Sequence, residues 1–439
     1  MTDQFQSLLS GFSSFYDGIT LHFSRSVSKS VQLNGQKPEN TDLSDNLTIY
    51  VRAVKNGRMI TSAFSGADEK TVENFLKSGM DTVIQLPADD FRVIPKYGFP
   101  ENGLGLTDGM FRSIGVKELT DIAKEMTSQA FKTDMRVKAV KQSYVSAALK
   151  ETEVISTMGP ALKSAKTVFS AGIYLIASDG RDERDCYESV MSTSLQGLKY
   201  ITAAVSAADS ACDLLGAKNI KTGRYSILFS AGVMADFIDL VLELTDGDNV
   251  YKGLSMLAGK LGTKAASENF TLTDDPLIMT GIASRSFDDE GQRCWPLDIF
   301  RGGELKNFLH NSYTSKALGV DNNGRAVLTS GGNIAVGATN IELATTSERK
   351  PAELADEYLK VTEVMGMHTA DPVSGDFSVG ISGILYRGGQ AVHPFKEAVL
   401  AGNLADLLEG LIHVFDNRRT FGNITTADTL FDKMSVSGV

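Results

Sequence analysis

Residues 366–411 read GMHTADPVSGDFSVGISGILYRGGQAVHPFKEAVLAGNLADLLEGL and combine a turn, two strands and a helix in one continuous pattern. The turn, Asp371–Ser378, is rich in Pro, Gly, Ser and Asp, which are the residues that turns favour. Alternating side chains follow it, and Gly388-Gly389 then provides a second turn. A second short strand and an apolar helix complete the run. The segment therefore predicts a β-hairpin that leads directly into a helix.

The region before it divides by composition into two α+β units. Residues 1–95 form the first unit, in which strands lie between an N-terminal helix and a second helix over 70–84. Between residues 19 and 33 every apolar side chain falls on an odd position, which predicts a strand with one apolar face. Asn56-Gly57 separates two alternating runs and predicts a tight hairpin, because both residues tolerate positive φ.

The central unit, residues 96–221, follows a linker rich in Pro and Gly. It contains an amphipathic helix over 116–131, a strand pair over 137–152 and an alanine-rich helix over 195–215. Residues 222–439 form the third unit, in which an apolar helix near the start precedes many short strands separated by Gly, Asn and Asp turns. The predicted fold class is α+β, with N-terminal α+β units followed by a mostly antiparallel β C-terminal domain with an early helix.

Composition restricts the classes of function. The 439 residues carry a formal net charge of −11, and an acidic surface disfavours binding to phosphate backbones. No run approaches the ~20 apolar residues that a membrane helix needs. The three cysteines are scattered and odd in number, which is not the pattern of a disulfide framework. We therefore expect a cytoplasmic protein that binds neither membranes nor nucleic acid.

Several segments together resemble one known family. They are the hairpin turn Asp371–Ser378, the run GIASRSFDDEG at 281–291, and residues 51–65, 300–319 and 417–438. In these segments the chain resembles the TldD/PmbA family, the "modulator of DNA gyrase" proteins. The resemblance is strongest from about residue 277 to the C-terminus. It implies a pair of subunit types, one a zinc metallopeptidase and the other its partner.

The metal-binding type of this family carries His-Glu-x-x-x-His on a helix early in the C-terminal domain. Two imidazoles on that helix can hold one zinc, and the Glu can act as general base on the zinc-bound water. The matching segment here, residues 229–251, contains neither His nor Cys, and residues 416–439 contain no Cys. The chain therefore resembles the metal-free PmbA (TldE) branch.

This resemblance implies a non-catalytic subunit of a heterodimeric zinc metallopeptidase of the TldD/TldE type. The complex would process extended or unfolded peptides, with zinc in the TldD-type His-Glu-x-x-x-His partner and no cofactor in this chain. This chain would be inactive alone and would shape the chamber and hold the substrate. The alternative is a regulatory protein that acts on a partner such as DNA gyrase without any proteolytic complex.

Carboxylates and histidines offer other candidate sites. Asp236, Asp239 and Glu243 have helical spacing on one face, and three carboxylates could bind a hard cation. A solvated face or a subunit interface is the favoured interpretation, because such spacing is common on helices. His368 and His393 flank the hairpin turn and could bind metal together if the hairpin brought them into contact. A lone His at a strand end more often serves as a hydrogen-bonding residue.

The hairpin itself supplies the predicted contact residues. Ser374 lacks a recognisable base and oxyanion hole, so Ser374 and Asp376 are expected to satisfy turn amides. Gly375 and Gly383 permit close backbone approach, and a peptide could add to this segment as a strand. We assign substrate or partner binding to Ser374, Gly375, Asp376, Phe377, Ser378 and Gly383. We assign no catalytic residue and no metal ligand to this chain.

Overall fold

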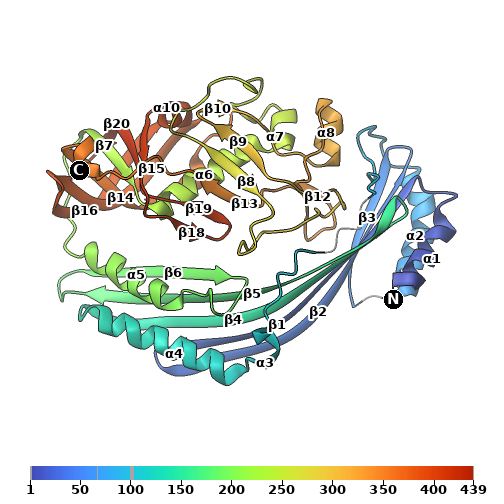
Figure 1. Cartoon of the computed structure of the whole chain (residues 1–439), viewed down its shortest axis with the longest axis horizontal. Helices are drawn as coiled ribbons and strands as arrows, with labels where there is room; N and C mark the ends of the chain where they lie inside the picture. Colours follow the sequence, from blue (N-terminus) through green and yellow to red (C-terminus); the bar gives the residue numbers. More distant parts are fainter. Residues whose placement is uncertain (1, 67, 99–102, 439) are drawn as a thin grey trace.

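The computed structural model describes residues 2–66, 68–98 and 103–438 of the chain. It has the predicted α+β fold and consists of a long curved sheet and a β-rich C-terminal part. In Figure 1 the C-terminal part lies along the concave side of the curved sheet. None of the helices in the described ranges combines the length and the apolarity needed to span a lipid bilayer.

The N-terminal sheet has six antiparallel strands in the order β3-β2-β1-β4-β5-β6. Their bounds are β1 Gly18–Asn34, β2 Lys37–Lys55, β3 Arg58–Ser65, β4 Val137–Ser156, β5 Gly159–Ser178 and β6 Glu183–Ser192. Because β1 pairs with β4, strands from residues 1–95 and from residues 96–221 share this sheet. The predicted strand pair over 137–152 is wrong, since β4 is one strand of 20 residues.

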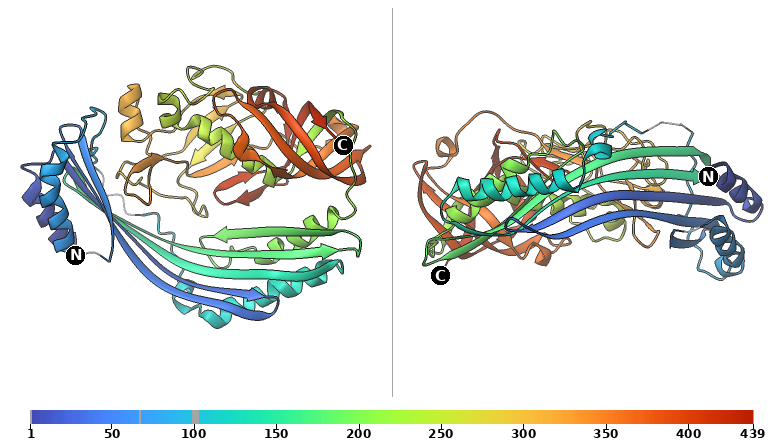
Figure 2. Two further views of the ribbon diagram at one scale, coloured as in Figure 1. Left: turned by 180° about the vertical axis from the view of Figure 1, so that it is seen from behind. Right: turned by 90° about the horizontal axis from the view of Figure 1, so that it is seen from below.

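Two helix pairs cover one face of this sheet. The N-terminal helices are α1 Thr2–Phe12, α2 Glu69–Val83, α3 Met110–Ser113, α4 Val116–Thr133 and α5 Tyr200–Asp213. Ile19 and Leu21 of β1 share a core with α1 and α2, and Val31 shares one with α4 and α5. Side chains at odd positions point to one face, so both pairs lie on the same side. Figure 2 shows α4 on the outer face, away from the C-terminal part.

The turn between β2 and β3 follows the sequence signal closely. Asn56 has φ of 48° and Gly57 has φ of 68°, so both central residues are left-handed. A two-residue turn of this kind matches the right-handed twist of the strands that it joins. The predicted hairpin is confirmed, and it fixes the register of β2 against β3 from Lys55↔Arg58 onward.

The C-terminal part contains two six-stranded sheets and a small two-stranded one. The first sheet has the order β16-β15-β14-β7-β20-β17, and β16 also pairs with β20. Its strands are β7 Gly223–Phe229, β14 Glu357–Met365, β15 Asp376–Arg387, β16 Gln390–Asn403, β17 Leu411–Val414 and β20 Thr429–Ser437. The second sheet has the order β10-β9-β8-β13-β19-β18. Its strands are β8 Leu272–Asp275, β9 Leu297–Arg301, β10 Glu304–Leu305, β13 Asn340–Leu343, β18 Arg419–Phe421 and β19 Ile424–Thr426.

One helix occupies the space between these sheets. Helix α6, Ala231–Thr245, shares a hydrophobic core with strands of both sheets, and Figure 1 shows it at the centre of the C-terminal part. Phe237 of α6 stacks on Phe229 of β7 with ring centroids 4.6 Å apart. The remaining elements are β11 Ala326–Leu328, β12 Ile334–Val336, α7 Gly247–Tyr251, α8 Ser312–Leu318, α9 Pro351–Leu354, α10 Leu404–Glu409 and the 3-10 helix η1 Met367–Thr369. The early helix expected from the sequence is therefore the centre of the domain core.

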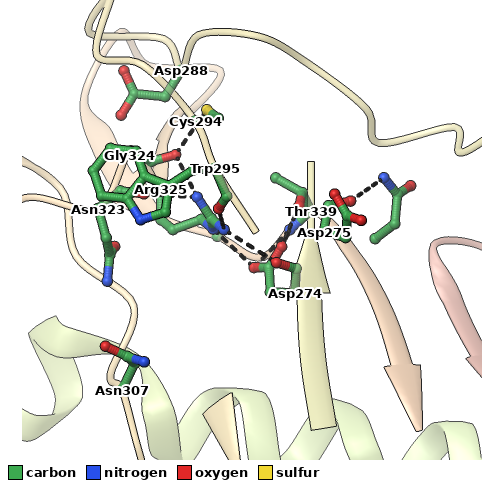
Figure 3. A network of polar contacts seen from close by, with 12 residues as sticks. Asp274, Asp275, Asp288, Cys294, Trp295, Asn307, Asn323, Gly324, Arg325 and Thr339 are labelled. Carbon is green, nitrogen blue, oxygen red and sulfur yellow. Dashed lines mark hydrogen bonds and ion pairs between the residues drawn. The ribbon is translucent and has the colours of Figure 1, made fainter. Parts of the chain in front are cut away.

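A fully buried ion pair fixes the second C-terminal sheet. The Nε of Arg325 donates to Asp274 of β8 at 2.9 Å, and both side chains are completely buried. Arg325 also donates to the carbonyls of Asn323 and Trp295, while the amide of Thr339 donates to Asp274 (Figure 3). Because each charge has several hydrogen-bond partners, the pair is compatible with the apolar interior.

We predict that Arg325→Leu destabilises the fold strongly, because it leaves the buried Asp274 carboxylate without its counter-charge. Breaking a buried pair in this way costs about 3–5 kcal/mol. Chemical denaturation of the purified variant measures the loss. Arg418→Leu is the matched control, since Arg418 pairs with Glu342 at 2.9 Å in an exposed setting. Equal losses in the two variants would contradict the structural role of the buried pair.

The turn at 287–291 connects the C-terminal part to the long sheet. Asp289 lies 3.2 Å from Nε2 of His22 in β1, and Glu290 accepts a hydrogen bond from Arg52 in β2 at 3.1 Å. Asp288 instead accepts backbone amides of its own domain, from Glu290 and Gln292 at 2.9 Å each. Two adjacent acidic residues thus attach the domain to two neighbouring strands of the N-terminal sheet.

We predict that this junction weakens in acid. Burial alone would raise the pKa of Asp289, but the hydrogen bond and charge of His22 lower it from 3.8 to about 2. A depressed carboxyl pKa adds stability that is complete above pH 3.8 and is lost as the pH falls toward 2. Asp289→Asn should therefore have a flatter stability profile than the parent as the pH falls from 3.8 toward 2, as measured by denaturant unfolding. Parallel profiles for both proteins would contradict this assignment.

Candidate functional site

Helix α6 exposes one polar stripe on an otherwise buried surface. Its cap residue, Ser230, accepts a hydrogen bond from the amide of Val233 and starts the helix at Ala231. Asp236, Asp239 and Glu243 are the exposed acidic positions, and the residues between them are buried or partly buried. The sequence-based prediction that these carboxylates share one face is confirmed. The stripe is the part of α6 that ligands can reach.

A cavity of about 540 Å³ lies against this stripe. Asp236 and Asp239 line it from α6, while Thr362, Glu363 and Val364 line it from β14. The turn between β18 and β19, residues 421–424, forms another wall. β14 is bulged at this point, because Val361 pairs with Gly383 and Glu363 pairs with Ser382. The bulge places the side chains of Thr362 and Glu363 at the cavity rim.

Charge repulsion and desolvation characterise the cavity. Although Asp236 is accessible, partial desolvation by the protein around it raises its pKa, and the charge of Asp239 raises it further. The pKa of Asp239 is raised in the same way by burial and by Glu243. Burial also raises the pKa of Glu363, to which the charge of Asp185 on β6 contributes. Three carboxylates on one cavity with raised pKa values make a site that favours positive charge.

The carboxylates do not form a ligand set for a metal ion. Within the described ranges, no group of three or more His, Cys, Asp or Glu side chains is arranged to hold one. Asp236, Asp239 and Glu363 line the cavity, whereas Glu243 does not. The α6 stripe therefore presents separate negative charges to whatever enters the cavity.

The predicted contact residues of the hairpin turn have structural roles. Asn403, the cap residue of α10, donates to the carbonyl of Ser374 and to Asp376, both at 2.8 Å. Gly375 has φ of 82°, and a Cβ there would lie 2.6 Å from the sulfur of Met256. Phe377 is buried against Phe237 of α6 with ring centroids 5.5 Å apart. Among these residues Ser374, Asp376 and Ser378 are exposed, whereas Gly375 and Phe377 are buried.

Gly383 does not lie on a free strand edge. It pairs with Val361 of β14 on one side and with Phe395 of β16 on the other. Its Cβ position lies 2.0 Å from the carbonyl oxygen of Lys360, so glycine is required for close strand approach. The interpretation of Gly383 as part of a strand edge open to peptides is therefore wrong, because both neighbouring positions are occupied.

The two histidines that flank the hairpin turn do not meet. His368 lies in η1 near the start of β15, and His393 pairs with Leu385 near its far end. The Nδ1 of His393 contacts the carbonyl of Pro394 at 2.9 Å, which is the hydrogen-bonding role expected of a lone His. The less favoured alternative, a metal site shared by the two imidazoles, is wrong, since the hairpin separates them along its length.

Sequence reasoning missed the residues that bring the N-terminal sheet to this cavity. Arg419 of β18 pairs with Glu188 of β6 at 3.3 Å, and the charges of Arg184 and Asp185 act on Glu363. These contacts join segments about 180 to 230 residues apart in the chain. Simple alternation gave no signal for Glu363, because Thr362 and Glu363 are adjacent polar residues at the bulge of β14.

We predict that Asp236→Asn stabilises the protein at pH 7. Because the folded-state pKa of Asp236 is raised above 3.8, ionisation weakens the native state as the pH rises through that interval. The neutral Asn side chain removes this loss, so the gain should vanish below pH 3.8. Denaturant unfolding of the variant and the parent at pH 7 and pH 3 measures this difference in stability. Asp42→Asn on the exposed part of β2 is the control, and equal effects at both sites would contradict the prediction.

Comparison with known proteins places this site in a family. Residues 222–438 match the family model described as the PmbA/TldA metallopeptidase C-terminal domain. The "Metalloprotease PmbA homolog" of Haemophilus influenzae is 23% identical over 423 residues, which cover 93% of this chain and 90% of that protein. The "Metalloprotease PmbA" of Escherichia coli is 27% identical over 227 residues, covering 51% of this chain and 48% of that protein.

Solved structures share the fold along the whole chain. TldE from Thermococcus kodakarensis superimposes with a TM-score of 0.88 at 18% identity, covering 99% of this chain and 100% of that one. A Thermotoga maritima protein named as a proposed modulator of DNA gyrase gives a TM-score of 0.88 at 23% identity, covering 99% of each chain. Residues 222–438 of this chain therefore form a domain of the PmbA/TldA metallopeptidase family.

Proposed function

We propose that this chain is the metal-free subunit of a two-subunit zinc peptidase of the TldD/TldE type. The observation that carries the proposal is the composition of α6. At the place where the family resemblance puts His-Glu-x-x-x-His, the exposed stripe holds Asp236, Asp239 and Glu243. The stripe offers neither the two imidazoles nor the Glu between them that the zinc motif uses as ligands and general base.

The cavity beside α6 supports a role in substrate binding. Its volume of about 540 Å³ is sufficient for several side chains of a peptide but does not enclose a folded domain. Its walls come from α6, β14 and the turn between β18 and β19, all of which belong to the C-terminal core. A cavity that no described His or Cys lines suits a subunit that holds peptide while the partner subunit supplies the zinc-bound water.

The names of the relatives define two competing possibilities. Several sequence relatives are named metalloproteases, which would make this chain a peptidase in its own right. Two structural relatives are named as proposed modulators of DNA gyrase, which would make it a regulator. The absence of His from residues 229–251 argues against the first, and the net charge of −11 argues against direct DNA contact in the second.

Reconstitution distinguishes these functions. The chain is purified alone and together with a family member from the same genome that carries His-Glu-x-x-x-His, and each sample is assayed with unstructured peptides. We predict cleavage only by the mixture, with complete loss when the Glu of the partner motif is replaced by Gln. Cleavage by the isolated chain would contradict the proposal. Inhibition of gyrase supercoiling by the chain, without any cleavage by the mixture, would favour the regulatory function.

A further inference from the structure

β6 is the last strand of its sheet, and no further strand of the described residues pairs with its outer edge. It pairs with β5 through ten consecutive residue pairs, from Phe169↔Ser192 to Ser178↔Glu183, without a register shift. In the part of the chain that the structure describes, no backbone hydrogen bond joins β6 to any segment other than β5. Apart from the amide of Glu183, which donates to the carboxylate of Asp182 at 3.0 Å, the amides and carbonyls that point away from β5 are therefore available to another strand.

This edge lacks three of the devices that usually prevent strand addition, namely Pro, Lys and a bulge, although it does carry acidic residues. Natural edges carry Pro, Lys or bulges that block pairing. The opposite edge of the same sheet carries both Lys and Pro, because the outer part of β2 begins with Lys37-Pro38. β6 has the sequence ERDCYESVMS, which contains neither Pro nor Lys. A regular edge of ten residues without such protection is a suitable template for an extended chain.

The edge lies beside the α6 cavity. Figure 1 shows β6 as the strand of the long sheet that lies nearest to the C-terminal part. Arg419 of β18 contacts Glu188 of β6 at 3.3 Å, which fixes the two parts at this point. Glu363 lines the cavity, and its pKa is raised by burial, lowered by the charge of Arg184 and raised by the charge of Asp185. A strand paired with β6 would therefore pass the mouth of the cavity.

The surroundings of the edge are strongly acidic. β6 carries Glu183, Asp185 and Glu188, and the cavity adds Asp236, Asp239 and Glu363. Two nearby cations offset part of this charge, since Arg184 forms an ion pair with Asp182 and Arg419 forms one with Glu188. The excess negative charge would be compensated by lysine or arginine side chains of a bound chain.

We propose that the free edge of β6 docks an extended peptide segment that carries Lys or Arg at alternate positions. The peptide would pair with β6 through main-chain hydrogen bonds, which make recognition largely independent of sequence. Alternate side chains of a strand point to the same face, so one set would reach Glu183 and Asp185. This inference rests on the proposed function, because it names the class of peptide that the metal-free subunit would hold.

Backbone-modified peptides test strand addition directly. The full-length chain is titrated with a fluorescently labelled ten-residue peptide of alternating Lys and Ser, and anisotropy reports binding. Two variants of the peptide carry N-methyl groups on every second amide, one in each register. We expect one register to abolish binding and the other to preserve it, because only every second amide of an added strand faces β6. Equal binding of both variants would overturn the proposal.

Charge variants of the chain test the choice of ligand. Glu183→Gln combined with Asp185→Asn should weaken binding of the Lys peptide by roughly tenfold, and added salt should reduce the difference. Asp42→Asn, on the outer part of β2 of the same sheet, is the matched control and should leave binding unchanged. Circular dichroism verifies that each variant is folded. Equal affinity of the double variant and the control would overturn the charge selection.

Hydrogen exchange locates the bound peptide. Amides in residues 183–192 should gain protection when the Lys peptide is added, while amides in residues 37–45 should not change. Protection of residues 183–192 in the free chain, with a dimeric mass in solution, would show that a second copy occupies the edge and would overturn the proposal. Failure of these binding tests would leave cleavage by the reconstituted pair unaffected, so the two proposals fail separately.

Discussion

The burial of α6 between two sheets is the constraint on which the site depends. The helix contributes Phe237, Ile238 and Val241 to the domain core, and these residues cannot change without loss of packing. Only the exposed stripe at Asp236, Asp239 and Glu243 is free to carry chemistry. A scaffold of this kind can therefore gain or lose a metal site through a few surface positions on one helix, while its fold stays the same.

The position of that stripe relative to the long sheet depends on the turn at 287–291. Asp289 and Glu290 reach His22 and Arg52 on two adjacent strands, and each pair is largely buried. Glu290 also accepts the amide and hydroxyl of Ser312, so it connects the sheet to the start of α8. Buried charges with several partners restrict the orientation of the two parts more than an apolar contact would, because each requires a particular geometry.

Local sequence patterns predicted the elements that depend on local physics. The odd-position apolar face of β1 and the Asn56-Gly57 turn both follow from side-chain alternation and backbone freedom, and the structure confirms them. Patterns could not reveal that β1 pairs with β4, because the two strands are more than 100 residues apart. For the same reason the pattern wrongly predicted an open strand edge at Gly383, which in fact pairs with β14. It also gave no indication that Glu363 lines the α6 cavity.

The metal content of the separated subunits tests the central claim, which is that this chain lacks the catalytic zinc of its complex. The chain and its His-Glu-x-x-x-His partner are purified individually and as a pair, dialysed against the same zinc solution, and analysed by mass spectrometry under native conditions. The account predicts one zinc ion on the partner, one on the pair and none on this chain. A stoichiometric zinc ion on the isolated chain that is lost when Asp236 and Asp239 are replaced by Asn would contradict it.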